Sequence, residues 1–120
     1  MGQPELVIKT READKVVIFD VEGEIRRTNE IQTTLHGLVE SHLDRGRRKV
    51  LVNLSGVSFI DSFGVGQILA SYKSTQNLGG KFKLCGISPK LLIIFQITML
   101  HKVLDIHEDC DRALESFGKT

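Results

Sequence analysis

The residues best placed to do chemistry are Asp61 and Ser62, a carboxylate and a hydroxyl that follow an apolar run at residues 49–54. A helical pattern begins directly after them, so the pair should lie in an exposed turn between a buried strand and a helix. Backbone N–H groups and the dipole at a helix start favour an anion, so a phosphate on Ser62 would meet little resistance apart from Asp61. Gly64 and Gly66 would let another backbone come close. The same pair would also serve as a plain helix cap, which on these residues alone is the more frequent role.

Other residues do not support an enzyme or a metal site. Ser62 has no nucleophile-elbow sequence around it and no histidine near it in the sequence, and a neutral serine is a poor nucleophile without an aligned base. The segment Gly64-Val65-Gly66 lacks the third glycine and the lysine of phosphate-binding loops. The histidines form two pairs, each six positions apart, which does not place them on one helical face: His36, His42, His101 and His107. We therefore expect no catalytic residue, no metal and no cofactor.

Length and composition indicate one ordinary folded domain. The chain has 120 residues, of which 41% are apolar and 26% charged. This predicts a single domain over residues 1–120, with a core at about 5–117. The 16 basic and 15 acidic residues leave a formal net charge of +1, so no broad surface for nucleic acid is expected.

The sequence also predicts a cytoplasmic location without direct membrane insertion. No apolar run approaches the roughly 20 residues needed to cross a bilayer, and the first residues lack the cationic and apolar blocks of a secretory signal. Cys85 and Cys110 are too far apart for a CxxC pair. We expect both thiols to be reduced, with Cys85 as a small core residue.

The elements that must position Asp61 and Ser62 alternate between strands and helices. β-Branched and apolar runs predict strands at about 6–8, 16–21, 49–54, 81–85 and 103–106. Helical spacing and caps predict helices at about 29–45, from 61 or 62 to before 79, from 89 onward, and at 109–117. Thr28 or Asn29 would cap the first helix, and Ser88 before Pro89 the third. The order predicts an α/β layer fold with a mixed sheet of about four or five strands and about four helices.

The segment Asp61-Ser62-Phe63-Gly64-Val65-Gly66 resembles a motif of the STAS domain, a family named for sulfate transporters and anti-sigma factor antagonists. The resemblance takes in Val52-Asn53-Leu54, Val57-Ser58-Phe59-Ile60, Gly79-Gly80 and Gly86-Ile87-Ser88-Pro89, and the order of elements extends it over nearly the whole chain. No single piece is specific, but the ordered set is. The chain therefore resembles the stand-alone bacterial anti-sigma factor antagonists, with a single-domain STAS-like fold.

This resemblance implies that Ser62 is the phosphorylation site of a protein switch. In stand-alone bacterial members, the serine after the motif aspartate is phosphorylated by a partner kinase that is also an anti-sigma factor. The unphosphorylated protein would bind that kinase and free a sigma factor, and the phosphorylated protein would release it. A serine phosphatase of the PPM type would reset the switch. The residues expected to bind the partner are Asp61, Ser62, Phe63, Gly64 and Val65, together with Arg26 and Arg27.

Residues near the motif depart from the family pattern. Many members carry an acidic residue after Gly-Glu-Leu in the loop that follows the second strand, whereas here Gly23-Glu24-Ile25 is followed by Arg26-Arg27. That loop should approach Ser62 in this fold. The arginines are then either solvated or paired with an acidic partner or with a phosphate on Ser62. Phe63, where small hydroxyl residues are common, adds an apolar contact beside the switch.

The third helix is more apolar than a surface helix needs to be. Leu92 and Ile93 fall where related sequences often carry Lys or Arg. We predict either an exposed apolar patch for a second contact, such as homo-oligomer formation, or extra burial beneath a neighbouring loop. The apolar helix also supports an alternative function, a STAS subunit that regulates the ATPase of a membrane ABC transporter for lipids.

Overall fold

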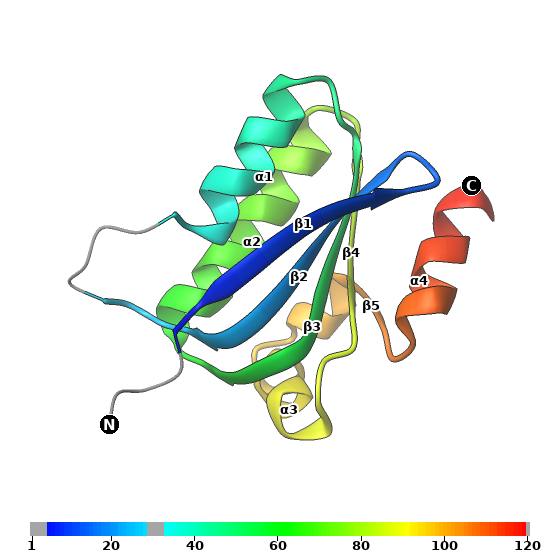
Figure 1. The fold of residues 1–120 in the computed structure, drawn as a ribbon. Coiled ribbons are helices and arrows are strands. Elements are labelled where there is room, and N and C mark those ends of the chain that lie inside the picture. The colour runs from blue at the N-terminus through cyan, green and yellow to red at the C-terminus, as the bar shows by residue number, and fades with distance from the viewer. Residues whose placement is uncertain (1–4, 29–32, 120) are drawn as a thin grey trace.

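Residues 5–28 and 33–119, which the computed structural model describes, contain one five-stranded sheet with four α-helices packed on its two faces (Figure 1). The strands lie in the order β1-β2-β3-β4-β5, with β1 antiparallel to β2 and the other neighbours parallel. The strands are β1 (Val7–Ala13), β2 (Val16–Ile25), β3 (Lys49–Ile60), β4 (Lys81–Cys85) and β5 (Asp105–His107). The helices are α1 (Leu35–Asp44), α2 (Ser62–Asn77), α3 (Pro89–Ile97) and α4 (Cys110–Ser116), with 3-10 turns at Leu100–Lys102 and Phe117–Lys119. The predicted mixed α/β fold is confirmed.

The first two strands form a hairpin, and both are longer than the sequence indicated. Their register brings Ala13 opposite Val16, so only Asp14 and Lys15 lie between them. Both turn residues have positive φ, at 51° and 67°. A two-residue turn of this kind has a twist that matches the twist of the strands, and it places β1 along the edge of the sheet.

The first helix begins later than predicted. Its N-cap is Thr34, whose side-chain oxygen accepts the N–H of Gly37 at 3.0 Å, and α1 starts at Leu35. Thr28 lies outside any helix, and the other predicted cap, Asn29, lies outside the described residues. Several hydroxyl and amide residues in this stretch are able to cap a helix, and apolar spacing alone does not choose among them.

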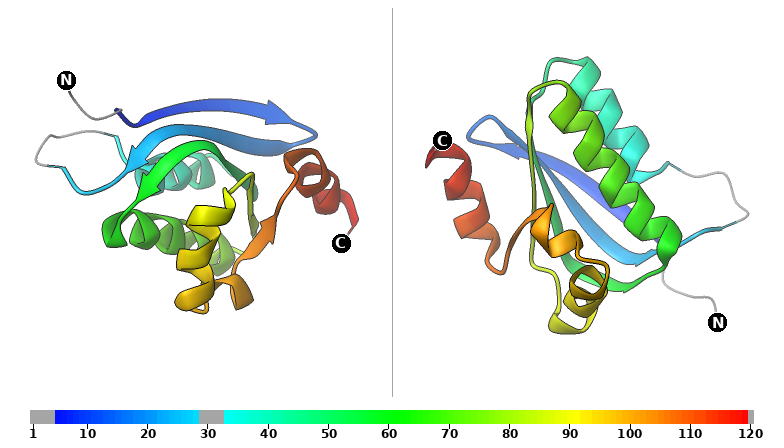
Figure 2. Two further views of the ribbon diagram at one scale, coloured as in Figure 1. Left: turned by 90° about the horizontal axis from the view of Figure 1, so that it is seen from below. Right: turned by 180° about the vertical axis from the view of Figure 1, so that it is seen from behind.

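Two apolar clusters lie on opposite faces of the sheet. The larger one packs beneath α1, α2 and α3 and includes Val50, Val52 and Leu54 of β3. The smaller one packs beneath α4 and consists of Val16, Ile18, Leu51, Cys85, Ala113 and Phe117. Figure 2 shows α1 and α2 together on one side of the strands and α4 on its own near the hairpin turn. Apolar residues of β3 are therefore buried on both faces, as the apolar run at 49–54 predicted.

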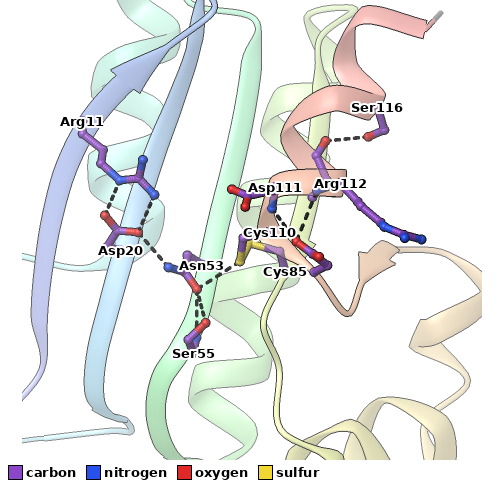
Figure 3. Close-up of a disulfide and its surroundings, with 11 residues drawn as sticks. Arg11, Asp20, Asn53, Ser55, Cys85, Cys110, Asp111, Arg112 and Ser116 are labelled. Atoms are coloured by element: carbon purple, nitrogen blue, oxygen red, sulfur yellow. Dashed lines mark hydrogen bonds and ion pairs between the residues drawn. A yellow bond between two sulfur atoms is a disulfide. The ribbon is translucent and has the colours of Figure 1, made fainter.

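Cys85 and Cys110 are joined by a disulfide, so the expectation of two reduced thiols was wrong (Figure 3). Cys85 ends β4, Cys110 begins α4, and their Cα atoms are 4.9 Å apart despite a separation of 25 residues. The physical reason is the parallel pairing of β5 with β4, which brings His107 opposite Cys85 and returns the chain to the same place. Cys85 is fully buried, so the prediction that it is a core residue is confirmed.

Candidate functional site

The site is built around Asp61, which joins three segments at the carboxyl ends of β2 and β3. Its Oδ1 accepts the N–H of Gly64 at 2.9 Å, which caps α2. Its Oδ2 accepts the N–H of Arg27 at 2.9 Å, and its own N–H donates to the carbonyl of Ile25 at 3.2 Å. One carboxylate therefore holds the loop after β2 against the start of α2. The prediction that this loop approaches Ser62 is confirmed in its geometry.

These hydrogen bonds also determine the ionisation of Asp61. Burial acts to raise the pKa of its carboxyl group, but the N–H groups of Arg27, Gly64 and Phe63 and the positive charge of Arg26 outweigh it. The pKa of Asp61 is therefore lower than the usual aspartate value of 3.8. The group is ionised at neutral pH and stabilises the folded state through its charged form.

Replacing Asp61 with alanine is expected to reduce the free energy of unfolding by about 1–2 kcal/mol, because a helix cap and a loop anchor are lost together. The folded-state pKa lies below the unfolded value, so the charged carboxylate stabilises the protein above about pH 4. That stabilisation declines as the pH falls through the folded-state pKa. Urea unfolding of wild type and Asp61→Ala at pH 7 and pH 3 should show a difference that shrinks in acid. The exposed Glu115→Gln variant is the control, and a pH-independent difference would contradict the assignment.

Ser62 is the first residue of α2, and its side chain is exposed. Asp61 performs the capping, and Ser62 stands next to the cap with its hydroxyl group facing solvent. The sequence left open whether this pair caps the helix or offers a hydroxyl for phosphorylation. Asp61 is the cap, and Ser62 keeps an accessible hydroxyl at the start of a helix.

Arg26 and Arg27 both have partners within this site, and Arg27 also remains exposed to solvent. Arg26 Nη1 pairs with Glu24 Oε1 at 3.3 Å. The guanidinium of Arg27 lies 5.3 Å from the centre of the Phe63 ring, close enough for a cation–π contact. Phe63 thus places an aromatic ring next to Ser62 in the sequence and also positions a cation there.

A cleft of about 300 Å³ adjoins the site and is lined by Glu24, Arg26, Phe59 and Asp61. Phe59 is 45% exposed at the end of β3. Sequence reasoning did not select Phe59 or Glu24 as site residues. The available signal was an aromatic residue two positions before Asp61 on a strand whose apolar residues are otherwise mostly buried.

Gly64 and Val65 support the site from beneath. Gly64 is buried, and a side chain there would collide with the carbonyl oxygen of Ile25 and with Ile60. The close backbone approach predicted for Gly64 therefore occurs within this chain. Val65 is partly buried and packs against the larger cluster, and as partner contacts both residues stay predictions.

Leu92 and Ile93 lie on α3, outside this site, and the structure separates them. Leu92 is partly buried against the larger cluster, whereas Ile93 is 51% exposed. The exposed apolar residues of α3 and the segment after it form what we call the α3 patch: Ile93, Ile97, Met99 and Val103. Leu92 therefore packs on the core and Ile93 faces solvent, and a second contact through these residues stays a prediction.

Residues 5–28 and 33–119 contain no group of three or more His, Cys, Asp or Glu side chains that could hold a metal ion. Over the same ranges, no helix has the length and apolar character needed to cross a membrane.

Comparison with known proteins defines the class to which this fold and site belong. Residues 7–113 match the STAS domain, and the chain belongs to the STAS domain family. The anti-sigma-B factor antagonist of Bacillus subtilis is 30% identical over 89 residues, which cover 65% of this chain and 82% of the relative. Homologues of this chain are thus named anti-sigma factor antagonists. Anti-sigma factor antagonists are regulators without enzymatic activity, in agreement with the prediction for this chain.

Solved structures confirm the fold. An anti-sigma factor antagonist from Mycobacterium paratuberculosis superposes with a TM-score of 0.81 at 21% identity, covering 93% of each chain. The Bacillus cell fate determinant SpoIIAA in its phosphorylated form superposes with a TM-score of 0.66 at 18% identity, covering 92% of this chain and 99% of the other. At these identities the superpositions establish the fold alone.

Proposed function

We propose that this chain is an anti-sigma factor antagonist whose choice of partner is set by phosphorylation of Ser62. Unphosphorylated chain binds an anti-sigma factor that is also a serine kinase, and phosphorylated chain releases it. The observation that carries the proposal is the exposed hydroxyl of Ser62 at the start of α2, beside an aspartate that already caps the helix. A kinase therefore has access to the hydroxyl without breaking the cap.

The surroundings of Ser62 tolerate the added charge. A phosphate at the first position of a helix is favoured by the N–H groups and the dipole there, so the fold need not change. What changes is the surface that a partner meets, because a dianion appears between Phe63 and the Arg26-Arg27 loop. An anti-sigma factor surface that fits the neutral hydroxyl would then meet a charge that it does not neutralise.

Arg26 and Arg27 give the phosphorylated state a further contact. Their present partners are a carboxylate and an aromatic ring, both of which bind a guanidinium less strongly than a phosphate does. We propose that one of them turns to the phosphate and orders the loop after β2.

A PPM-type serine phosphatase removes the phosphate, and the switch operates in the cytoplasm without inserting into the membrane.

Affinity capture from the native host tests this function directly. Wild type, Ser62→Ala and Ser62→Asp serve as bait, and mass spectrometry identifies both the captured proteins and the phosphorylation state of the bait. The expected result is an anti-sigma factor kinase bound to wild type and Ser62→Ala but lost from Ser62→Asp. Capture of a transporter ATPase by all three baits would instead support the alternative, a STAS subunit of a membrane ABC lipid transporter.

The α3 patch supports a second contact, and we propose that its occupant is a second copy of this chain. No charged residue occurs between Leu91 and Leu100, although the exposed Lys90 and Lys102 flank this stretch. Ile97 is 76% exposed, and Ile93, Met99 and Val103 are each 51% exposed. Several large apolar side chains in one short segment are thus left in contact with solvent. An apolar surface is able to pack against the same surface of a second copy, as the interface of a symmetric pair requires.

The Ile93→Lys, Ile97→Lys double variant is expected to remove self-association while leaving thermal unfolding cooperative, because both side chains are exposed. Leu92→Lys should instead cost roughly 2 kcal/mol or more of stability, because Leu92 packs against the larger cluster. Sedimentation of each protein over a range of concentrations, with urea unfolding alongside, separates the two effects. Identical sedimentation of wild type and the double variant would show that the α3 patch is not a self-association surface.

A further inference from the structure

The disulfide between Cys85 and Cys110 attaches α4 to the sheet, and its two halves differ in exposure (Figure 3). Cys85 is fully buried at the end of β4, with 0% of its surface exposed. Cys110, the first residue of α4, is partly exposed. Cys110 packs against the smaller cluster but is the less buried half, so a thiol should attack from its side, which makes Cys85 the leaving group.

The other attachments of α4 are few. The helix has seven residues and buries Ala113, and Phe117 follows it into the smaller cluster. Lys83 Nζ donates to Ser116 Oγ at 2.6 Å and lies 4.9 Å from the centre of the Phe117 ring. Among the described residues, none from α4 belongs to the larger cluster beneath α1, α2 and α3. The disulfide is thus the strongest single attachment of α4, and the main core does not depend on it.

The surroundings of Cys110 suit a free thiol as well as a disulfide. Cys110 Sγ lies 3.3 Å from Asn53 Oδ1, which is able to accept the S–H once the disulfide is reduced. The amide is held in that orientation, because Asn53 Nδ2 donates to Asp20 Oδ1 at 2.8 Å and Asn53 Oδ1 accepts the N–H of Ser55 at 3.0 Å. The polar group beside the sulfur is therefore already in place for the reduced state.

We propose that Cys85 and Cys110 form a reversible redox site that exchanges with low-molecular-weight thiols of the glutathione class. A thiolate attacks Cys110 Sγ, the S–S bond breaks, and its electron pair leaves on Cys85 Sγ, which takes up a proton. A second thiolate attacks the sulfur of the bound thiol in the mixed disulfide and releases Cys110. The protein gains two electrons and two protons, and two small thiols become one small disulfide. The inference rests on the proposed function in one respect, the cytoplasmic setting, where thiol pools keep persistent disulfides rare.

The consequence of reduction lies on the face of the sheet beneath α4. Without the disulfide, a seven-residue helix is held by a small apolar contact and the Lys83 interactions, so it should detach far more often. Detachment uncovers Val16, Ile18 and Leu51, which are now almost completely buried. The redox state would therefore control access to an apolar surface that is separate from Ser62.

The full chain in buffers of varied reduced-to-oxidised glutathione ratio provides the test. The thiol content, measured by the mass added on alkylation, should change in one two-electron step. Hydrogen exchange at residues 110–117 should be at least roughly tenfold faster in the reduced protein, while α1 and α2 exchange at the same rate in both states. Cys85→Ala should take up one glutathione at Cys110 under native conditions, whereas Cys110→Ser should take up none at buried Cys85.

Three outcomes would contradict the proposal. A disulfide that survives a large excess of reduced glutathione would be a permanent structural bond, and equal hydrogen exchange of α4 in both states would show that the bond does not control the helix. Glutathione uptake by Cys110→Ser in the folded protein would also contradict the assigned order of attack. The assay contains no partner protein, so its failure would leave the role of Ser62 untouched, and loss of partner capture would not affect this result.

Discussion

Replacing Ser62 with aspartate should weaken binding of the anti-sigma factor by roughly a hundredfold or more, because an unpaired charge at an interface costs several kcal/mol. The same change should alter the free energy of unfolding by less than about 0.5 kcal/mol, because Ser62 is exposed and a negative charge is tolerated at a helix start. The loss would thus arise at the interface. Calorimetric titration against the captured anti-sigma factor, with urea unfolding of the same samples, measures both quantities.

The control for charge is Ser62→Asn, which has the shape of the aspartate variant and no charge. If charge is the signal, Ser62→Asn should retain most of the affinity and Ser62→Ala should retain nearly all of it. Equal losses for Ser62→Asn and Ser62→Asp would mean that size, not charge, blocks the partner. Wild-type affinity in Ser62→Asp would rule out the phosphoswitch at this residue.

Gly64→Ala and Gly66→Ala should change stability in opposite directions although they lie two residues apart in α2. Alanine normally stabilises a helix relative to glycine by about 1 kcal/mol. At Gly66 nothing lies within 4 Å of the added methyl group, so that gain should be realised. At Gly64 the methyl group would collide with the backbone of Ile25, and a net loss of about 2–3 kcal/mol is expected because backbone cannot move aside as a side chain does.

Urea unfolding of wild type and the two variants tests this prediction. The free energy of unfolding should rise for Gly66→Ala and fall for Gly64→Ala. A second readout is the affinity for the anti-sigma factor, which should fall for Gly64→Ala because the loop that carries Arg26 and Arg27 would be displaced from α2. Stabilisation of both variants would show that β2 and α2 are not in close contact at this point. The close approach of Gly64 to Ile25 would then be wrong.

The extent to which the sequence predicts this structure depends on how local each signal is. The strand at 49–54, the helix start at Asp61 and the cap at Ser88 are encoded by neighbouring residues, and each agrees with the structure. The start of α1 at Leu35 was missed because several residues before it could cap a helix, and the choice depends on packing. Local patterns thus predict the presence of an element better than its ends.

Contacts between distant segments were the less predictable part of the site. The family resemblance predicted that the Arg26-Arg27 loop lies near Ser62. The structure agrees, because parallel pairing places Ile25 opposite Ile60. The resemblance did not show that Arg27 would lie on Phe63, because this depends on side-chain positions specific to this chain. The disulfide was missed for a similar reason, since it depends on the register of β5 with β4.

The two edges of the sheet limit how this protein can associate. One edge is β1, which carries the charged residues Lys9, Arg11 and Glu12, and the other is β5, which has only three residues. Charged and very short edge strands are two means by which proteins prevent another strand from pairing with them. A partner or a second copy is therefore not expected to extend the sheet by adding a strand. Association must instead use helices and side chains, so replacing single exposed residues should be sufficient to abolish it.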